Sequence, residues 1–241
     1  MGSNEYVVGM GGKTRFNPLI ARLYDYINLY FEHRQAPQHR QYLAADISGT
    51  VLEVGPGTGT MVPYFEAERG VTAYYGIEPD PGMRRQALER FDNTTLDGEV
   101  IAGRAEQLPF SDGQFDVVVT SCVFCSVPDL GSALSEIARV LDTDGEFRFF
   151  EHVRSPGLIG RTQDMLTPLW RRFGGNCHLN REFVPDVREE TALSLTEVQA
   201  YTSGHYPIRE FVRGRATPQD DERKGPDCGP CDVLERMARD G

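Results

Sequence analysis

VLEVGPGTG, residues 51–59, is the stretch of sequence that decides the fold. Its apolar first half predicts a short, buried strand. Gly55, Gly57 and Gly59 then permit a sharp turn into a helix and close approach of a ligand to the backbone. Ligands of open α/β sheets bind at such turns, beyond the carboxyl ends of the strands. The stretch therefore predicts an α/β fold with a ligand crevice at this turn.

Strands and helices alternate after this turn, which predicts right-handed βαβ units and a parallel sheet. The valines of the segment 115–121 are typical of a strand buried on both faces. The expected strands cover residues 50–54, 73–78, 98–103, 115–121, 146–153, 196–202 and 207–216. The helix that follows the glycine turn is expected to end near residue 68. Later helices are expected at 80–91, 130–141, 158–173 (interrupted or kinked at Pro168) and 183–194, and a turn is expected at 144–145.

Two classes of nucleotide-like ligand suit a glycine-rich turn. A dinucleotide needs the spacing G-x-G-x-x-G and amide donors for its pyrophosphate. Here Thr60 follows Gly59, so the third glycine comes one residue early. S-adenosylmethionine has no phosphate, and the carboxylate of Glu53 accepts its ammonium group directly or through water. The pattern favours S-adenosylmethionine, and an NAD-dependent oxidoreductase is the weaker alternative.

Further candidate cofactor residues follow the next two strands. Glu78, followed by Pro79 in the segment GIEPD, ends the second strand, where a carboxylate accepts both ribose hydroxyls. GRAEQLPF (103–110) places Ala105 and Glu106 after the third strand, where an adenine ring is expected. For Glu78 the alternative is an ordinary exposed acid at a strand end, and for residues 103–110 it is a plain surface turn.

The segment TSCVFCSVPDL, residues 120–130, leaves the fourth strand where cofactor and substrate are expected to meet. Ser121 and Val123 are candidates for cofactor contact, and Phe124 is a candidate for substrate contact. For each residue, plain packing beneath the loop is the alternative.

These segments, together with LDTDGEFRFFEHV (141–153), resemble the ordered motifs of class I S-adenosylmethionine-dependent methyltransferases. The resemblance implies a Rossmann-like, seven-stranded and mostly parallel sheet with helices on both faces and the last strand antiparallel. It also implies S-adenosyl-L-methionine as cofactor and methyl transfer to a small-molecule acceptor.

Two groups within that family differ in their acceptor. YDYIN (24–28) resembles a segment of quinone-biosynthesis C-methyltransferases, whereas FCSV (124–127), EHV (151–153) and PLWRRFGGNCHLNRE (168–182) resemble small-thiol S-methyltransferases. His178 and Asn180 depart from the thiol pattern, and that group's apolar, membrane-anchoring N-terminus has no counterpart in this sequence. The acceptor therefore stays open between a thiol, a quinol or a similar molecule.

The resemblance also suggests how the chain is divided. Apolar residues recur at helical spacing from Phe16 to Tyr30, and a second short helix is expected at 36–46. Helices before the first strand often cover the active site in this superfamily. We expect a flexible N-terminus, a helical lid, the methyltransferase domain, and a linker with a C-terminal tail, at residues 1–14, 15–48, 49–216 and 217–241.

Methyl transfer from a sulfonium requires alignment of the acceptor with the departing sulfur, and it requires no metal. A protonated acceptor also needs a base, for which His152 at the end of the fifth strand is the best candidate; a structural histidine is the alternative. Tyr24, Asn28 and His178 are further substrate candidates. Because no base is unmistakable, a cofactor-binding regulator without catalysis is a second candidate function.

The five cysteines do not indicate a disulfide framework. Cys122, Cys125 and Cys177 suggest a thiolate site for a metalloid, as in arsenite methyltransferases, but the spacing differs and buried cysteines often act as small hydrophobes. Cys228 and Cys231 resemble a redox pair without the strand that normally precedes one. We assign no metal ligand from these patterns.

The net charge of −11, with Lys13 and Lys224 as the only lysines, disfavours nucleic acids and anionic membranes as partners. An acidic surface adapted to a high-salt cytoplasm is a sharper interpretation of the same composition. No apolar run is long enough to span a bilayer, and the start lacks the apolar middle of a secretion signal. We therefore expect a cytoplasmic enzyme, whose oligomeric state the sequence leaves open.

Overall fold

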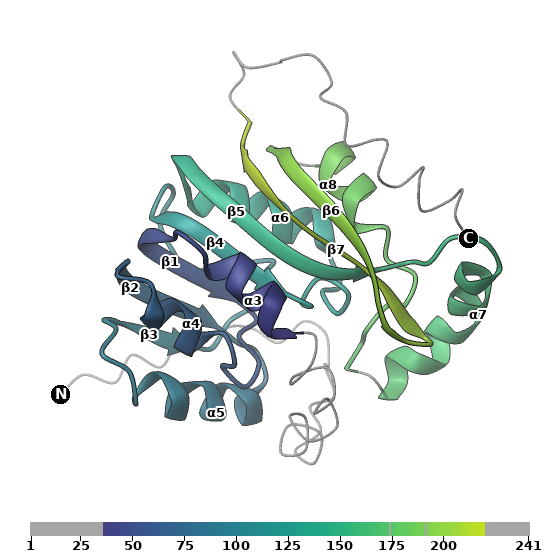
Figure 1. Cartoon of the computed structure of the whole chain (residues 1–241), viewed down its shortest axis with the longest axis horizontal. Helices are drawn as coiled ribbons and strands as arrows, with labels where there is room; N and C mark the ends of the chain where they lie inside the picture. The colour runs from purple at the N-terminus through teal and green to yellow at the C-terminus, as the bar shows by residue number, and fades with distance from the viewer. Residues whose placement is uncertain (1–35, 174, 191, 220–241) are drawn as a thin grey trace.

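The computed structural model describes residues 36–173, 175–190 and 192–219. Within this part of the chain, one seven-stranded sheet has the order β3-β2-β1-β4-β5-β7-β6 (Figure 1). Its strands are β1 (Ser48–Val54), β2 (Gly70–Ile77), β3 (Gly98–Ile101), β4 (Phe115–Ser121), β5 (Leu141–Val153), β6 (Leu193–His205) and β7 (Ile208–Pro218). The helices are α3 (Ala36–Ala44), α4 (Val62–Ala67), α5 (Pro81–Phe91), α6 (Leu130–Val140), α7 (Gly157–Phe173) and α8 (Phe183–Glu190).

The strand directions confirm the predicted fold class. β1 pairs in parallel with β2 and β4, β2 with β3, and β4 with β5, whereas β7 pairs antiparallel with β5 and β6. The strand order reverses at β1, so the chain leaves β1 and β4 in opposite directions along the sheet. This is the switch point at which open α/β sheets bind ligands.

Alternate side chains of the strands enter two cores. Val51, Val117 and Val119 face the core that α3, α4 and α5 cover, whereas Leu52 and Val118 face the core that α6 and α8 cover. Figure 1 shows these two helical layers on opposite faces of the sheet. The predicted doubly buried character of the strand 115–121 is therefore confirmed.

Several boundaries differ from the sequence prediction, and three of the differences have a structural reason or change the element. β5 begins at Leu141 and runs through the turn expected at 144–145, because the β4–β5 ladder shifts register between Phe115 and Val117 and absorbs the extra residues. α7 continues through Pro168 without interruption, since Leu166 and Trp170, on either side of the proline, both pack against one small apolar cluster. β6 begins at Leu193, within the end of the expected helix 183–194.

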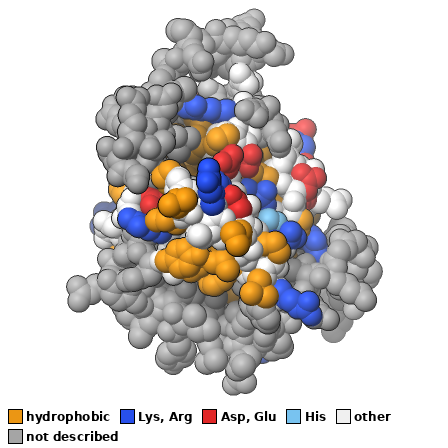
Figure 2. All heavy atoms as spheres, turned by 90° about the vertical axis from the view of Figure 1, so that its right-hand side faces the viewer, with side chains coloured by type: hydrophobic (Ala, Val, Ile, Leu, Met, Phe, Trp, Pro, Cys, Tyr) orange, Lys and Arg blue, Asp and Glu red, His pale blue; other side chains and the backbone are white. Residues whose placement is uncertain are grey.

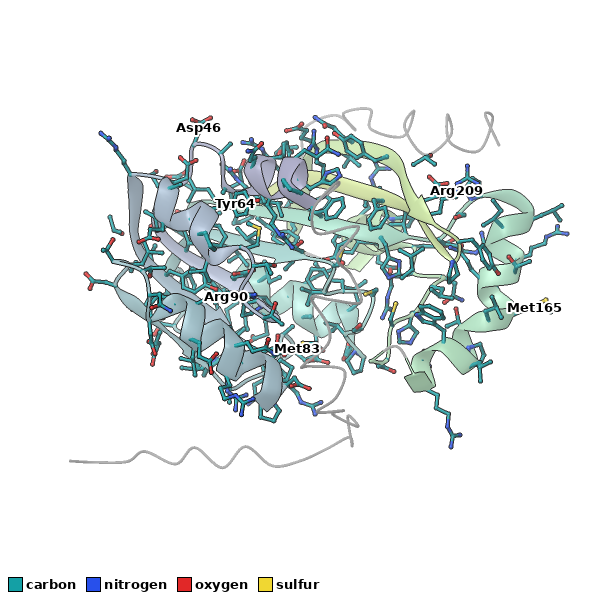
Figure 3. The ribbon with its side chains drawn as sticks, turned by 60° about the horizontal axis from the view of Figure 1, so that its bottom comes forward. Asp46, Tyr64, Met83, Arg90, Met165 and Arg209 are labelled. Carbon is teal, nitrogen blue, oxygen red and sulfur yellow. The ribbon has the colours of Figure 1, made fainter. Side chains whose placement is uncertain are left out.

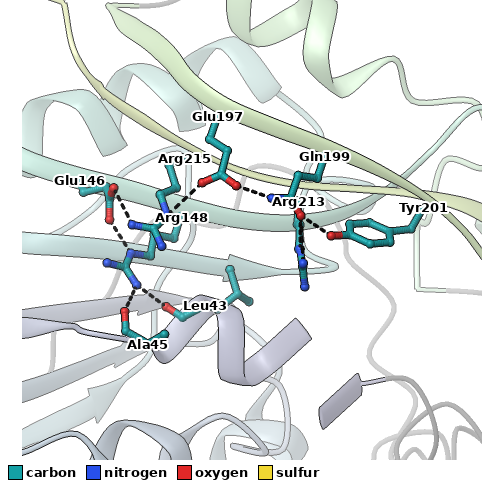
Figure 4. Close-up of polar contacts among 9 residues, drawn as sticks. All are labelled: Leu43, Ala45, Glu146, Arg148, Glu197, Gln199, Tyr201, Arg213 and Arg215. Carbon is teal, nitrogen blue, oxygen red and sulfur yellow. Dashed lines mark hydrogen bonds and ion pairs between the residues drawn. The ribbon is translucent and has the colours of Figure 1, made fainter. Parts of the chain in front are cut away.

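Arg148 on β5 links the end of α3 to strands β5 and β7 of the sheet (Figure 4). Its guanidinium donates to the backbone carbonyls of Leu43 and Ala45, at the end of α3 and just beyond it, and pairs with the carboxylate of Glu146. Glu146 in turn pairs with Arg215 on β7. The Arg148 side chain is only 5% exposed. These partners therefore supply the hydrogen bonds that the guanidinium would make with water if it were exposed.

α7 presents an apolar outer face. Leu158, Met165 and Leu169 are 76%, 81% and 60% exposed. Figure 2 shows hydrophobic side chains gathered on this side of the molecule, and Met165 projects outward from α7 in Figure 3. Among the described helices, none is both long enough and apolar enough to cross a lipid bilayer.

Replacement of Arg148 by alanine is expected to lower the free energy of unfolding by roughly 2–3 kcal/mol, because two carbonyls and a carboxylate lose a charged donor. Urea unfolding monitored by circular dichroism measures the change. The exposed Arg161 on α7 supplies the matched control, and Arg161→Ala should change the free energy by less than about 0.5 kcal/mol. Equal effects of the two variants would contradict a structural role for Arg148.

Candidate functional site

The glycine turn adopts backbone angles that suit glycine. Gly55, Gly57 and Gly59 have φ values of 70°, 59° and 83°, a region that other residues rarely occupy. A Cβ atom on Gly59 would lie 2.8 Å from the Cα atom of Ala87 in α5, and one on Gly55 would lie 2.8 Å from a methyl carbon of Val123. By contrast, a Cβ atom on Gly57 would meet nothing within 4 Å. The turn is thus packed at both ends and open in the middle.

Glu78 at the end of β2 binds this open part of the turn. Its Oε2 accepts a hydrogen bond from the backbone N–H of Gly57 at 3.0 Å, and its Oε1 accepts one from the N–H of Asp80 at 2.8 Å. Each carboxylate oxygen has a second lone pair, so both retain capacity for a further donor. Burial raises the pKa of Glu78 to about 7.

Glu53 lies on β1, just before the glycine turn, where its side chain is almost fully buried. The hydroxyl of Tyr74 on β2 donates to Glu53 Oε2 at 2.6 Å. Burial raises the pKa of Glu53 to about 7, although the Tyr74 hydrogen bond opposes that shift. The two acids that the sequence analysis singled out therefore flank the same turn, and both are costly to ionise there.

Supporting contacts hold the turn and α5 together. Asp80 caps α5 by accepting from the N–H groups of Gly82 and Met83 at 2.7 and 2.9 Å. Arg90, near the end of α5, donates to the carbonyl of Thr58 within the turn; it is labelled in Figure 3. The helix N-terminus is thus fixed beside Glu78, with Pro79 exposed between them.

The remaining predicted cofactor residues have different environments. Ala105 is buried, and Glu106 is half-buried in a short turn closed by the bridge between Arg104 and Gln107. At the end of β4, Ser121 and Val123 are half-buried. Val123 lies against Gly55, so the turn and the loop after β4 form adjoining walls.

The loop after β4 is held by an acid that the sequence analysis missed. Glu151 on β5 is completely buried, and its carboxylate accepts from the backbone N–H groups of Val123 and Phe124, both at 3.1 Å. Burial raises the pKa of Glu151 to about 8. The only signal in the sequence was its place beside His152, one residue before the histidine that drew attention.

Phe124 does not face a crevice. Its side chain has no exposed surface, and its ring stacks on Phe183 with the ring centroids 5.3 Å apart. The position of Phe124 therefore agrees with packing beneath the loop, which was the alternative, and does not agree with contact to the substrate. The loop places the aromatic ring inward because Val123 on the other side meets the glycine turn.

Residues 176–181 cover the same loop from outside. The amide of Asn176 donates to the carbonyl of Ser126 at 2.9 Å, and the guanidinium of Arg181 donates to that of Val127 at 2.7 Å. His178 bonds the carbonyl of Cys125 through both its backbone N–H and its ring Nδ1. His178 also lines a polar recess together with Asn180 and Arg181.

His152, the predicted base, is buried at the end of β5. Its Nε2 lies 3.1 Å from the sulfur of Cys177, so a thiol already occupies one of its two ring nitrogens. A hydrogen bond with Cys125 lowers the pKa of Cys177. The substrate candidates Tyr24 and Asn28 lie outside the described residues.

Known proteins are similar to this chain in sequence. Residues 52–149 match the family model described as a methyltransferase domain. Thiol S-methyltransferase TMT1A of Homo sapiens is 33% identical over 174 residues, covering 69% of this chain and 70% of that protein. TMT1B of Rattus norvegicus is 32% identical over 157 residues, or 62% of this chain and 61% of that protein. A ubiquinone/menaquinone biosynthesis C-methyltransferase of Campylobacter jejuni is 29% identical, with coverages of 61% and 65%.

A solved structure supports the same fold. Geranyl diphosphate C-methyltransferase of Streptomyces coelicolor, in complex with S-adenosyl-L-homocysteine, superposes with a TM-score of 0.62 at 15% identity, covering 81% of this chain and 82% of that one. Sheet order, glycine turn and strand-end acids define a nucleoside-binding α/β enzyme. The chain belongs to the class I S-adenosylmethionine-dependent methyltransferases.

S-adenosylmethionine fits the residues that are present. The open space beside Gly57 admits a ligand to the backbone, and the two acids offer acceptors rather than the amide cradle that a pyrophosphate requires. Glu78 itself occupies the N–H of Gly57, which removes a donor from any phosphate. These observations agree with the family's cofactor and disfavour a dinucleotide.

The raised pKa of Glu53 predicts how stability depends on pH without cofactor. The folded state holds its proton up to about pH 7, whereas the unfolded chain releases it near pH 4.5. Glu53 therefore lowers the free energy of unfolding less at low pH than at neutral pH. Its contribution becomes progressively unfavourable as the pH rises from about 4.5 to about 7.

Between about pH 5 and pH 8, the wild type should lose roughly 2–3 kcal/mol relative to Glu53→Gln, which keeps an acceptor for Tyr74 but cannot ionise. Chemical denaturation at each pH, analysed as the difference between the two proteins, measures the loss. Glu99→Gln, at an exposed position on β3, is the control and should follow the wild type. Parallel pH profiles for wild type and Glu53→Gln would refute the assigned burial.

Proposed function

We propose that this enzyme transfers the methyl group of S-adenosylmethionine to the sulfur of a small thiol. The main support is the pairing of the segment 176–181 with the loop 123–127, which places the part of the chain that resembles thiol S-methyltransferases directly on the loop beside the glycine turn. The human and rat relatives, named as thiol S-methyltransferases, agree with this acceptor. We further propose a cytoplasmic location and a small-molecule acceptor rather than nucleic acid, in keeping with the net charge of −11.

The cofactor half of the proposed site divides the work among a few residues. Glu78 accepts the ribose hydroxyls with its two oxygens, and the glycine turn gives the ligand close access to the backbone. Glu53 attracts the ammonium group. Ala105 and Glu106 form the adenine side, with Pro79 at its edge, and Ser121 and Val123 separate the cofactor from the acceptor.

The bound cofactor supplies a methyl carbon that is already electrophilic, so the protein's own contribution is mainly alignment. Glu151 fixes the backbone of Val123 and Phe124, and this holds the loop at one distance from the glycine turn. His178 and its neighbours hold the other side of the loop. A thiol attacks as its thiolate, so the acceptor half must also favour loss of the thiol proton.

Replacement of Glu78 by alanine is expected to weaken binding of S-adenosylhomocysteine by about 1–3 kcal/mol, or roughly 5- to 150-fold, through loss of charge-assisted hydrogen bonds. Isothermal titration calorimetry measures the affinity. Glu99→Ala on the exposed surface of β3 is the matched control and should bind as the wild type does. An unchanged affinity in Glu78→Ala would contradict the ribose assignment.

The acceptor is tested with a panel of small thiols, quinols and phenols, using formation of S-adenosylhomocysteine and mass spectrometry of the products. We expect methyl thioethers as the products of the thiols. Turnover should fall in Glu78→Ala at low cofactor concentration, because a smaller fraction of the enzyme holds its cofactor. Methylation confined to quinols would favour the C-methyltransferase alternative. No product with any acceptor, although S-adenosylhomocysteine binds, would favour a regulator without catalysis.

A further inference from the structure

Three side chains of types that commonly bind metal ions meet at the loop after β4. Cys125 lies in that loop, His152 ends β5, and Cys177 follows α7, so three separate parts of the chain converge. Their ligand atoms, the two Sγ atoms and a ring nitrogen, all lie within 4.8 Å of one another. His152 Nε2 and Cys177 Sγ are 3.1 Å apart. The side chains are buried, so the cluster is not a chance gathering at the surface.

The spacing suits a tetrahedral ion. With Zn–S bonds of about 2.3 Å and Zn–N bonds of about 2.0–2.1 Å, neighbouring ligand atoms are separated by roughly 3.5–3.8 Å. The observed distances, from 3.1 Å to at most 4.8 Å, bracket this range. Side-chain adjustments of less than about 1 Å would therefore centre an ion. Thiolate and imidazole ligands select Zn²⁺ over hard cations such as Mg²⁺.

We propose that Cys125, His152 and Cys177 bind one Zn²⁺ ion and that the acceptor thiol occupies its fourth coordination position. The second part rests on the proposed thiol methyltransferase function, whereas the first does not. Catalytic zinc sites have three protein ligands and one open position, and structural sites have four. A set of two cysteines and one histidine belongs to the first kind, and it makes His152 a metal ligand rather than a base.

The surroundings of the cluster favour this role. Leu179 is fully buried beside it, and Leu166 and Trp170 of α7 pack over it together with Ile208 of β7. An apolar shell limits solvent access and strengthens the electrostatic effect of an ion. Two thiolates and a neutral imidazole balance the charge of Zn²⁺, so the site is neutral before the acceptor enters. A bound acceptor thiolate adds one negative charge, which the sulfonium of the cofactor opposes.

The position relative to the cofactor crevice connects the cluster to methyl transfer. Cys125 is two residues from Val123, which contacts the glycine turn, and Glu151 beside His152 fixes the intervening backbone. A coordinated thiol is deprotonated outright. The thiol therefore gives up its proton to solvent before it enters the buried site, and it binds the ion as a thiolate. The acceptor sulfur then forms a bond to the methyl carbon, while the bond from that carbon to the donor sulfur breaks and its electron pair stays on the donor sulfur.

The first experiment measures metal content by elemental analysis after expression with zinc and dialysis. Cys228→Ser/Cys231→Ser serves as the background, so that thiols outside the described residues contribute nothing. We expect about one Zn²⁺ per chain, and at least a hundredfold weaker Zn²⁺ affinity in Cys125→Ser and Cys177→Ser. Cys122→Ser, three residues from Cys125 but outside the cluster, should keep its zinc.

The second experiment needs no ligand variant, so misfolding of one cannot confuse it. Co²⁺ replaces Zn²⁺ in the background protein, where thiolate-to-metal absorption bands report Cys coordination. Adding a thiol that the enzyme methylates should change these bands, and an equal concentration of the corresponding alcohol should not. Bands that the thiol leaves unchanged would overturn the fourth-ligand assignment.

Absence of bound zinc and of cobalt thiolate bands would overturn the metal site itself, as would a Cys125–Cys177 disulfide found by mass spectrometry of the protein purified under reducing conditions. Thiol methylation by metal-free protein, with chelator present, would refute the role of zinc and leave the proposed function standing. Loss of thiol methylation in protein that retains zinc and cobalt bands would instead count against the proposed function.

Discussion

The contact between Glu78 and the backbone of the glycine turn is the constraint on which the rest of the site depends. One carboxylate joins the end of β2 to the turn after β1 and to the start of α5, through Gly57 and Asp80. The protein's own hydrogen bonds therefore hold these three segments together, which lowers the entropic cost of ordering them when a ligand binds. Burial of Glu78 and Glu53 raises the pKa of both carboxyls to about 7. Their ionisation is thus unfavourable until a ligand supplies donors or positive charge.

The proposed cofactor and acceptor halves share one structural element, the loop after β4. Val123 touches the glycine turn on one side, while Cys125 belongs to the buried cluster with His152 and Cys177 on the other. Glu151 and the segment 176–181 fix the loop through its backbone rather than through its side chains. The loop is consequently fixed relative to the paired strands β4 and β5. This arrangement suits a reaction whose barrier falls mainly through alignment.

The sequence predicted the sheet well, and it singled out the glycine turn and the two acids beside it, because both features follow local rules. Alternating strands and helices, the three glycines, and acids at the ends of β1 and β2 each leave a pattern within a few residues. Glu151 leaves no such pattern, and the sequence suggested a thiolate site at Cys125 and Cys177 without His152. The grouping of these residues comes from packing between segments 25 residues or more apart in sequence. The same reason explains Phe124: its type suggested a substrate wall, but only the position of Phe183 shows that it belongs to the core. The turn expected at 144–145 does not precede the strand but lies within β5, where the register of the β4–β5 ladder shifts and Asp142 accepts from the N–H of Asp144.

The most direct test of the central claim is a crystal structure of the protein with S-adenosylhomocysteine. The account predicts the ribose hydroxyls within hydrogen-bond distance of both carboxylate oxygens of Glu78, with the amino acid portion of the ligand passing Gly57 toward Glu53. An empty crevice at saturating ligand, or a ligand bound elsewhere on the protein, would contradict it.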